Sequence, residues 1–243
     1  MRMQFLGSGD AFGSGGRFNS CILLETESIR YLLDCGASSL IAMKCRHVDP
    51  NSISTILVTH LHADHFGGLP FFLLDAQFAR RRSPLTIVGP PGLRERLTQA
   101  MEIGFPGLSA TVRKFDLTLL EWAPRQLTSL DSMTVTPYEV CHGGMVQSFA
   151  LRAEVEGSII SYSGDTEWCT GLEEAARDAD LFICEGYSYD KPIKAHLDLA
   201  TLEAHLPAIR TRRLVLTHMS PDMLARTSSL GYEFAEDGKV IEV

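Results

Sequence analysis

Apolar residues occur along the chain in short runs that are separated by glycine, proline, aspartate or asparagine. Runs of this kind, rich in isoleucine, leucine and valine, are typical of β-strands. They occur at Met3–Leu6, Cys21–Glu25, Tyr31–Asp34, Thr55–Thr59, Leu85–Val88, Met133–Val140, Ser148–Val155, Ser158–Ser163, Leu181–Cys184 and Arg213–Thr217. Several of them are apolar throughout, which favours strands that are covered on both faces of a sheet.

Longer amphipathic stretches predict helices between these strands. They are Phe66–Arg81, Pro91–Glu102, Glu167–Ala179, Asp198–Arg210 and Pro221–Ser229. Pro91 suits the first turn of its helix, and Asp198 or Thr201 can cap the helix that follows them. We therefore expect an α/β fold in which two mixed β-sheets pack together and are flanked by helices.

The composition fits one globular domain that spans residues 1–243. The chain is 45% hydrophobic and 21% charged, and it contains no low-complexity linker. No apolar run approaches the roughly 18 residues that a membrane-spanning helix needs. The apolar stretch after Met1 is too short for the core of a signal peptide, so we expect a cytoplasmic protein without a membrane partner.

The net charge of −8 argues against a protein with a global basic footprint for nucleic acid. The basic cluster of the chain is Arg80-Arg81-Arg82, shortly before Pro84. We interpret this cluster as the solvated end of a helix, and a patch that faces phosphate is the alternative.

Four side chains that can bind metal fall within six positions, directly after the apolar run that ends at Thr59. They are His60, His62, Asp64 and His65. In an extended backbone the first two point to the same side, so both imidazoles can bind one ion. The last two lie where the chain turns into a helix, and they can serve a second ion nearby. Imidazole and carboxylate suit zinc or another first-row divalent ion, and a polar surface turn is the alternative.

The apolar run that ends at His60 is similar in sequence to a second run near the end of the chain. Residues 54–60 read Ser-Thr-Ile-Leu-Val-Thr-His, and residues 213–218 read Arg-Leu-Val-Leu-Thr-His. Because each histidine follows a strand that is apolar throughout, the two strand ends could face one another across a cleft.

The pattern from His60 to His65 resembles the H-x-H-x-D-H signature of the metallo-β-lactamase superfamily, whose fold is an αββα sandwich. The rest of the chain agrees with this resemblance in order and spacing. The implied ligands of the first ion are His60, His62 and His142. The implied ligands of the second ion are Asp64, His65 and His218, with Asp165 between the two ions.

Within the superfamily, the chain is similar to the ribonuclease Z-like branch of tRNA 3′-processing endonucleases and phosphodiesterases. Residues 5–11, 17–20, 33–36, 87–93 and 180–185 carry this similarity. The branch places a histidine that binds no metal at the position of His196, supported by a glutamate like Glu185. The resemblance implies that His196 protonates the leaving oxygen or binds a phosphoryl oxygen, and that Glu185 holds the imidazole in position. Asp64 would orient or deprotonate the water between the ions.

Two departures from that branch concern the substrate. The branch holds its substrate with a long arm that is inserted before the third metal histidine, and the segment from Leu93 to His142 is too short to contain such an arm. After the last histidine the chain reads Ser220-Pro221-Asp222-Met223 instead of Ser-x-Arg-Tyr. With the negative net charge, these departures predict the chemistry of the branch on a smaller or different substrate, rather than efficient processing of tRNA.

We therefore expect a metal-dependent phosphodiesterase whose nucleophile is a hydroxide shared by two zinc-type ions, with manganese or iron as alternative metals. The expected substrate is a small or cyclic phosphodiester or a nucleic-acid end. Hydrolysis of a lactone, thioester or sulfate ester on the same site is the alternative reaction, and a non-catalytic metal-binding scaffold is the alternative of another class. The sequence argues against an electron-transfer di-iron protein on this scaffold, because such a protein carries an acidic residue at the position of His62. The resemblance also implies a homodimer.

Overall fold

Two seven-stranded β-sheets form the centre of the computed structural model, which describes residues 1–144 and 147–243. The first sheet has the order β14 (Val240–Glu242), β1 (Arg2–Gly7), β2 (Cys21–Glu25), β3 (Arg30–Leu33), β4 (Thr55–Leu57), β5 (Leu85–Gly89) and β6 (Leu117–Glu121). The second has the order β13 (Glu233–Phe234), β12 (Leu214–Thr217), β11 (Leu181–Glu185), β10 (Ser158–Tyr162), β9 (Ser148–Val155), β8 (Met133–Val140) and β7 (Thr128–Leu130). Both sheets combine parallel and antiparallel pairs, as predicted.

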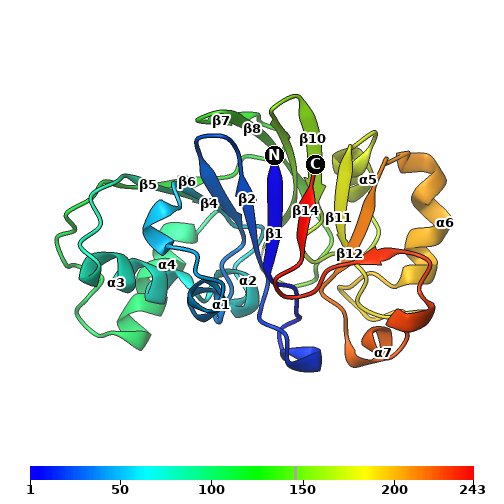
Figure 1. Cartoon of the computed structure of the whole chain (residues 1–243), viewed down its shortest axis with the longest axis horizontal. Helices are drawn as coiled ribbons and strands as arrows, with labels where there is room; N and C mark the ends of the chain where they lie inside the picture. Colours follow the sequence, from blue (N-terminus) through cyan, green and yellow to red (C-terminus); the bar gives the residue numbers. More distant parts are fainter. Residues whose placement is uncertain (145–146) are drawn as a thin grey trace.

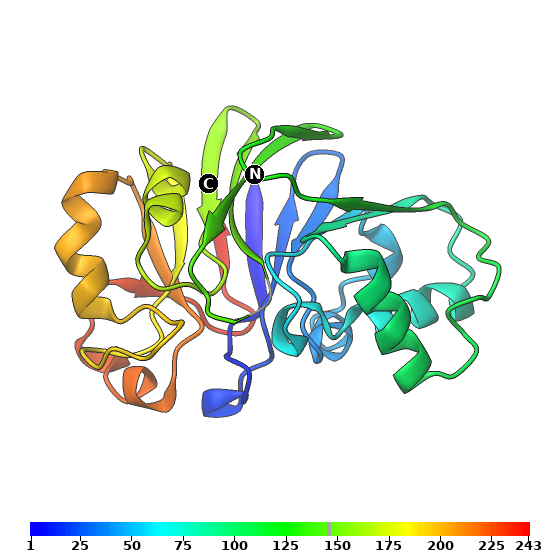
Figure 2. The same cartoon turned by 180° about the vertical axis from the view of Figure 1, so that it is seen from behind.

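Helices cover the outer face of each sheet (Figures 1 and 2). Those beside the first sheet are α1 (Ser39–Cys45), α2 (Ala63–Phe66), α3 (Leu69–Phe78) and α4 (Leu93–Gly104). Those beside the second sheet are α5 (Thr170–Ala176), α6 (Leu199–Ile209) and α7 (Pro221–Leu224). The predicted sandwich of two mixed sheets flanked by helices is therefore confirmed. Within the described ranges, no helix has the length and apolarity needed to span a bilayer.

Three apolar clusters fill the spaces between these layers. On β2, Ile22 belongs to the cluster between the sheets, whereas Leu23 belongs to the cluster under α1 to α4. On β11, Ile183 faces the other sheet, whereas Phe182 packs under α5 to α7. Neighbouring residues of a strand point to opposite faces. The strands that read as apolar throughout are therefore buried on both faces, as their sequence predicted.

The observed elements follow the predicted ones closely where the apolar run is long. All the predicted strands are present, and β2, β8 and β9 have the predicted bounds. Asp198 caps α6 by accepting a hydrogen bond of 2.9 Å from the backbone N–H of Thr201. The sequence did not predict α1, nor the strands β6, β7, β13 and β14.

Four of the predicted helices needed correction. The helix predicted at Phe66–Arg81 is shorter, because α3 spans only Leu69–Phe78, and Gly67 and Gly68 separate it from the short helix α2, which the sequence did not predict. A Cβ at Gly68 would clash with the backbone of Gly36. Pro91 lies ahead of α4, which begins only at Leu93. The helix predicted from Glu167 starts at Thr170, and helix α7 ends at Leu224, before a separate 3₁₀ turn at Thr227–Ser229.

Strand direction determines where the side chains with metal-ligand chemistry meet. β8 and β9 are antiparallel, as are β9 and β10, while β10, β11 and β12 are parallel to one another. β8, β10, β11 and β12 therefore end at the same edge of the second sheet. The segments that follow them carry His142, Asp165 and His218, and Glu185 is the last residue of β11.

Arg81 has a structural role that its sequence did not predict. Its side chain is buried, at 3% exposure. Its guanidinium donates hydrogen bonds to the backbone carbonyls of Pro50, Asn51, Ile53, Ser83 and Pro84. The interpretation of this position as a solvated helix end was wrong, and the donors of Arg81 are used by the backbone rather than available to a phosphate.

We expect Arg81→Met to lower the free energy of unfolding by about 3 kcal/mol, because several buried carbonyls would lose their donor. Arg82→Met is the matched control, since the side chain of Arg82 is exposed. Urea unfolding of both variants measures the difference. Equal unfolding midpoints for the two variants would show that the buried guanidinium does not stabilise the fold.

Candidate metal centre

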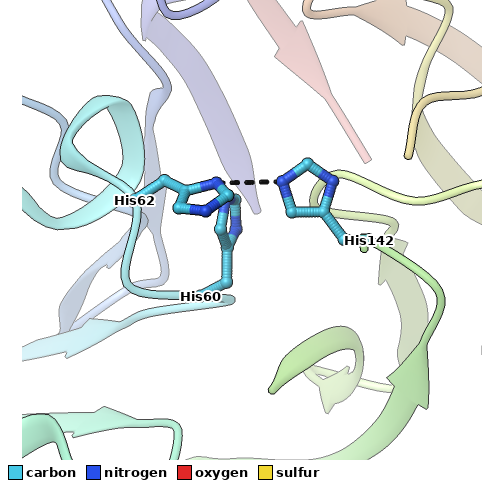
Figure 3. Close-up of side chains that lie close together, drawn as sticks. All are labelled: His60, His62 and His142. Carbon is cyan, nitrogen blue, oxygen red and sulfur yellow. Dashed lines mark hydrogen bonds between the residues drawn. The ribbon is translucent and has the colours of Figure 1, made fainter. Parts of the chain in front are cut away.

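Three histidines from two sheets converge on one point (Figure 3). His60 and His62 follow β4 of the first sheet, and His142 follows β8 of the second. One ring nitrogen of each lies within 4.8 Å of the others, and Nδ1 of His62 is 3.0 Å from Nε2 of His142. Nδ1 of His60 contacts the hydroxyl of Thr59 at 3.1 Å. The ring of His60 is therefore held at one nitrogen and presents the other, Nε2, to the group.

A second group of four ligand-type side chains adjoins the first. It consists of Asp64, His65, Asp165 and His218, whose ligand atoms lie within 4.8 Å of one another. Nε2 of His65 is 3.1 Å from Oδ1 of Asp165, and Nε2 of His218 is 3.2 Å from Oδ2 of Asp64. Oδ2 of Asp165 also lies 3.7 Å from Nε2 of His142 in the first group. The structure thus brings all seven predicted ligands together, with Asp165 adjacent to both groups.

Asp34 belongs to this centre although the sequence was not interpreted in that way. Its Oδ2 lies 2.6 Å from Nδ1 of His65 and accepts a hydrogen bond of 2.9 Å from the hydroxyl of Tyr162. The backbone N–H of Thr59 donates to its other oxygen. A carboxylate in this position fixes which ring nitrogen of His65 faces the other ligands. The signal in the sequence was an aspartate at the end of an apolar run, directly before Cys35-Gly36.

The charges of the centre suit a divalent cation. Burial lowers the pKa of His60 well below its usual value, so its ring is neutral, the form that binds metal. Burial alone raises the pKa of Asp165, but His218 and His65 hold that pKa well below the usual range. The pKa of Asp64 is lowered in the same way, against the effect of its burial, by His65 and by the hydrogen bond from His218. Burial lowers the pKa values of His65 and His218, but Asp165 and the other nearby carboxylates raise both above the usual value. Ionised carboxylates therefore lie among these imidazoles and beside the neutral ring of His60.

Two buried atoms of the centre fit metal binding directly. Nε2 of His60 and Oδ1 of Asp165 are buried and have no hydrogen-bond partner among the residues that the structure describes. Buried polar atoms in folded proteins are nearly always satisfied, and a divalent ion in contact with these atoms would satisfy both. The donor set of nitrogen and carboxylate oxygen is the one that first-row divalent metals prefer.

His196 and Glu185 lie beside the two groups of ligands. Nδ1 of His196 is 2.9 Å from Oε2 of Glu185, which is fully buried at the end of β11. Burial raises the pKa of Glu185 well above its usual value. The ring of Tyr187 stacks on the imidazole of His196, with ring centres 4.3 Å apart. The rings of His196 and His142 lie 5.1 Å apart in an edge-to-face arrangement.

The centre opens into a cavity of about 390 Å³. His196, Tyr187, Lys194 and Phe12 line this cavity together with residues of both ligand groups. A volume of this size is typical of pockets for small molecules. The remaining histidines belong to no ligand group among the described residues, and His205 instead stacks on Trp168 at 4.2 Å.

We expect Asp34→Asn to weaken metal binding by about 10- to 100-fold, because His65 loses the carboxylate that orients its ring. Competition with a chromogenic chelator measures the affinity. Asp178→Asn is the control, since this exposed carboxylate pairs with Arg210 away from the centre. An unchanged affinity in Asp34→Asn would remove Asp34 from the metal centre.

Comparisons with known proteins agree with this geometry. A family model described as anti-Pycsar protein Apyc1 matches residues 1–241. Ribonuclease Z of Methanosarcina acetivorans is 26% identical, over 90% of this chain and 88% of its own length. Ribonuclease Z of Exiguobacterium sp. is 31% identical, over 88% of this chain and 72% of its own length. The crystal structure of the short form of human tRNase Z has a TM-score of 0.80 and 26% identity, and covers 100% of this chain and 99% of that one. The predicted resemblance to ribonuclease Z-like metallo-β-lactamase proteins is confirmed.

Proposed function

The chain belongs to the anti-Pycsar protein Apyc1 family and to the ribonuclease Z-like proteins of the metallo-β-lactamase superfamily. From this membership we propose that the protein binds two zinc ions and uses them to hydrolyse small phosphodiesters. It is a metal-dependent hydrolase that acts on phosphodiesters. The observation that carries the proposal is the contact of Asp165 with both groups of ligand atoms, at 3.1 Å from His65 and 3.7 Å from His142. Nitrogen and carboxylate ligands support zinc as the metal.

The side chains have separate roles in this proposal. We assign the first ion to His60, His62 and His142, and the second to Asp64, His65 and His218, with Asp165 shared. When bound, two divalent ions activate a water molecule and neutralise charge on a phosphoryl oxygen. Asp64 lines the cavity and also belongs to the second group, so its carboxylate can also orient that water. The Nδ1 contacts of His60 and His65 with Thr59 and Asp34 fix the orientation of these rings.

We propose that His196 delivers a proton to the leaving oxygen. Its Nδ1 is engaged by Glu185 at 2.9 Å, which leaves Nε2 as the atom for the substrate. The stacked ring of Tyr187 restricts rotation of the imidazole. A proton donor placed in this way raises the rate most for substrates whose leaving oxygen is strongly basic.

The surroundings of the cavity support a small substrate. The interval from Leu93 to His142 is occupied by α4, β6, β7 and β8, and the chain carries a net charge of −8. A cavity of about 390 Å³ accommodates a small or cyclic phosphodiester or the end of a nucleic acid, rather than a folded tRNA.

We also propose a homodimer, in line with the resemblance stated from the sequence. Large apolar side chains on α3 and α4 support it, since Phe78 is 80% exposed and Ile103 is 85% exposed. Phe71, on the same side of α3, is 48% exposed and contacts Phe105 edge to face. Exposed apolar patches of this kind mark protein interfaces, and light scattering of the purified protein tests the proposal.

A panel of substrates tests the proposed reaction. The zinc-loaded protein is assayed with an aryl phosphodiester, a thioester, a lactone and an aryl sulfate, before and after removal of metal with a chelator. We expect hydrolysis of the phosphodiester alone, loss of that activity with the metal, and recovery when zinc is added. Turnover of the thioester, lactone or sulfate ester without turnover of the phosphodiester would show that the assigned reaction is wrong.

A further inference from the structure

Glu167 makes hydrogen bonds to two segments beside His142, one through its backbone and one through its carboxylate. Its backbone N–H donates a hydrogen bond of 2.8 Å to the carbonyl of Cys141, the residue before His142. Its carboxylate accepts a hydrogen bond of 2.6 Å from the backbone N–H of Ala195, the residue before His196. One exposed residue between β10 and α5 therefore links the two loops that carry a metal ligand and the proposed proton donor.

Ala195 has a backbone conformation that needs such support. Its φ angle is +71°, in the left-handed region that residues with a Cβ seldom adopt. Conformations of this kind persist only where surrounding contacts hold them. The loops also approach closely here, because a Cβ at Gly143 would lie 3.2 Å from the Cβ of Ala195. The hydrogen bond from the N–H of Ala195 to Glu167 is one of the contacts that hold this turn, beside the backbone hydrogen bond of 3.0 Å from His196 to Ile193.

The carbonyl of Ala195 acts on the metal centre. It lies 2.7 Å from Nδ1 of His142, and a carbonyl can only accept. Nδ1 of His142 must therefore carry the proton, and Nε2 is left with its lone pair toward His62 and Asp165. Such partners fix the tautomer and the orientation of a ligating histidine.

We propose that Glu167 is a positioning residue that, by holding the backbone of Ala195, sets the tautomer of the metal ligand His142 and the place of His196. This inference rests on the proposed metal centre. Loss of an outer partner of a ligating histidine typically weakens metal binding by about 10- to 100-fold. Because water reaches Glu167, we expect an effect near the lower end of that range.

Four variants test the proposal: Glu167→Ala, Glu167→Gln, Ala195→Gly, and Glu167→Ala combined with Ala195→Gly. Zinc affinity is measured by competition with a chromogenic chelator, and kcat and KM are measured with an aryl phosphodiester. Glu173→Ala is the control, since this side chain pairs with Arg177 on the surface of α5.

We expect Glu167→Ala to weaken the binding of one zinc ion about tenfold and to lower kcat more than it changes KM. Glu167→Gln keeps an oxygen that accepts from Ala195, so it should bind zinc like the unmodified protein. Glycine adopts a positive φ without penalty, so Ala195→Gly should recover part of the affinity that Glu167→Ala loses. Thermal unfolding of the zinc-free variants should match that of Glu173→Ala.

Two results would overturn the proposal. One is unchanged zinc affinity in Glu167→Ala while the unmodified protein binds two ions. The other is an equal loss in Glu167→Gln and Glu167→Ala, which would mean that the hydrogen bond to Ala195 is not what matters. A protein that binds no zinc before any substitution would instead overturn the proposed function on which this inference depends.

Discussion

Replacing Asp165 by alanine is expected to remove both metal ions and to lower kcat/KM by at least about 10⁴-fold. Asp165 is 3% exposed, and its carboxylate lies close to His65, His218 and His142 in both ligand groups. Without it, five imidazoles would face two divalent cations with one buried carboxylate fewer to balance their charge. The pKa of the attacking water would return from near neutrality toward that of bulk water, which accounts for the size of the loss.

Zinc content per chain and kcat/KM on an aryl phosphodiester measure this effect together. Asp178→Asn serves as the control again, because its carboxylate lies on the surface. Retention of two zinc ions by Asp165→Ala would show that the carboxylate is not shared between them. Full activity with a reduced zinc content would show that one ion is sufficient for the reaction.

Replacing His196 by alanine is expected to lower kcat by about 10²- to 10⁴-fold while the zinc content stays unchanged. His196 contributes a proton rather than a metal bond in this account, and its partner is the buried carboxylate of Glu185. The loss should depend on the leaving group. An alkyl phosphodiester, whose leaving oxygen needs a proton, should lose far more activity than a p-nitrophenyl ester, whose leaving oxygen needs none.

His205→Ala is the matched control, because His205 stacks on Trp168 outside the cavity. Metal analysis and steady-state kinetics with both esters give the comparison. Equal losses for the two esters would argue for a role of His196 in binding the phosphoryl group instead. An unchanged kcat for both would exclude His196 from the mechanism.

The ligands that are neighbours in the sequence were predictable from local structure, whereas the distant ones were not. His60 to His65 follow one buried strand, so their density alone indicates a metal site. His142, Asp165 and His218 are single residues after other strands, and only the resemblance to a known superfamily assigned them. The structure shows the physical reason for their convergence, since β8, β10 and β12 end at the same edge of their sheet.

The residues that support the ligands could not be found from local patterns. Asp34 acts through His65, and Glu167 acts through the backbone of Ala195. Each contact joins segments that are far apart in the sequence. Arg81 shows the same limit in the fold, because its two arginine neighbours are exposed while it lies buried among carbonyls of the segment before β4.

The strands that the sequence did not predict have short or diluted apolar patterns. β6 (Leu117–Glu121) is an edge strand whose residues are half-exposed or exposed, so its apolar pattern is diluted. β13 and β14 are short, and they form by pairing with β12 and β1. Strands with a long apolar run and two buried faces, such as β2 and β9, were predicted with their correct bounds.

Anomalous diffraction at the zinc absorption edge, on crystals of the zinc-loaded protein, tests the central claim most directly. We expect two peaks roughly 3.5–4 Å apart. One should lie beside Nε2 of His60, the other beside Nε2 of His65, and the carboxylate of Asp165 should contact both. A single peak, or peaks that lie away from Asp165, would contradict the two-ion centre.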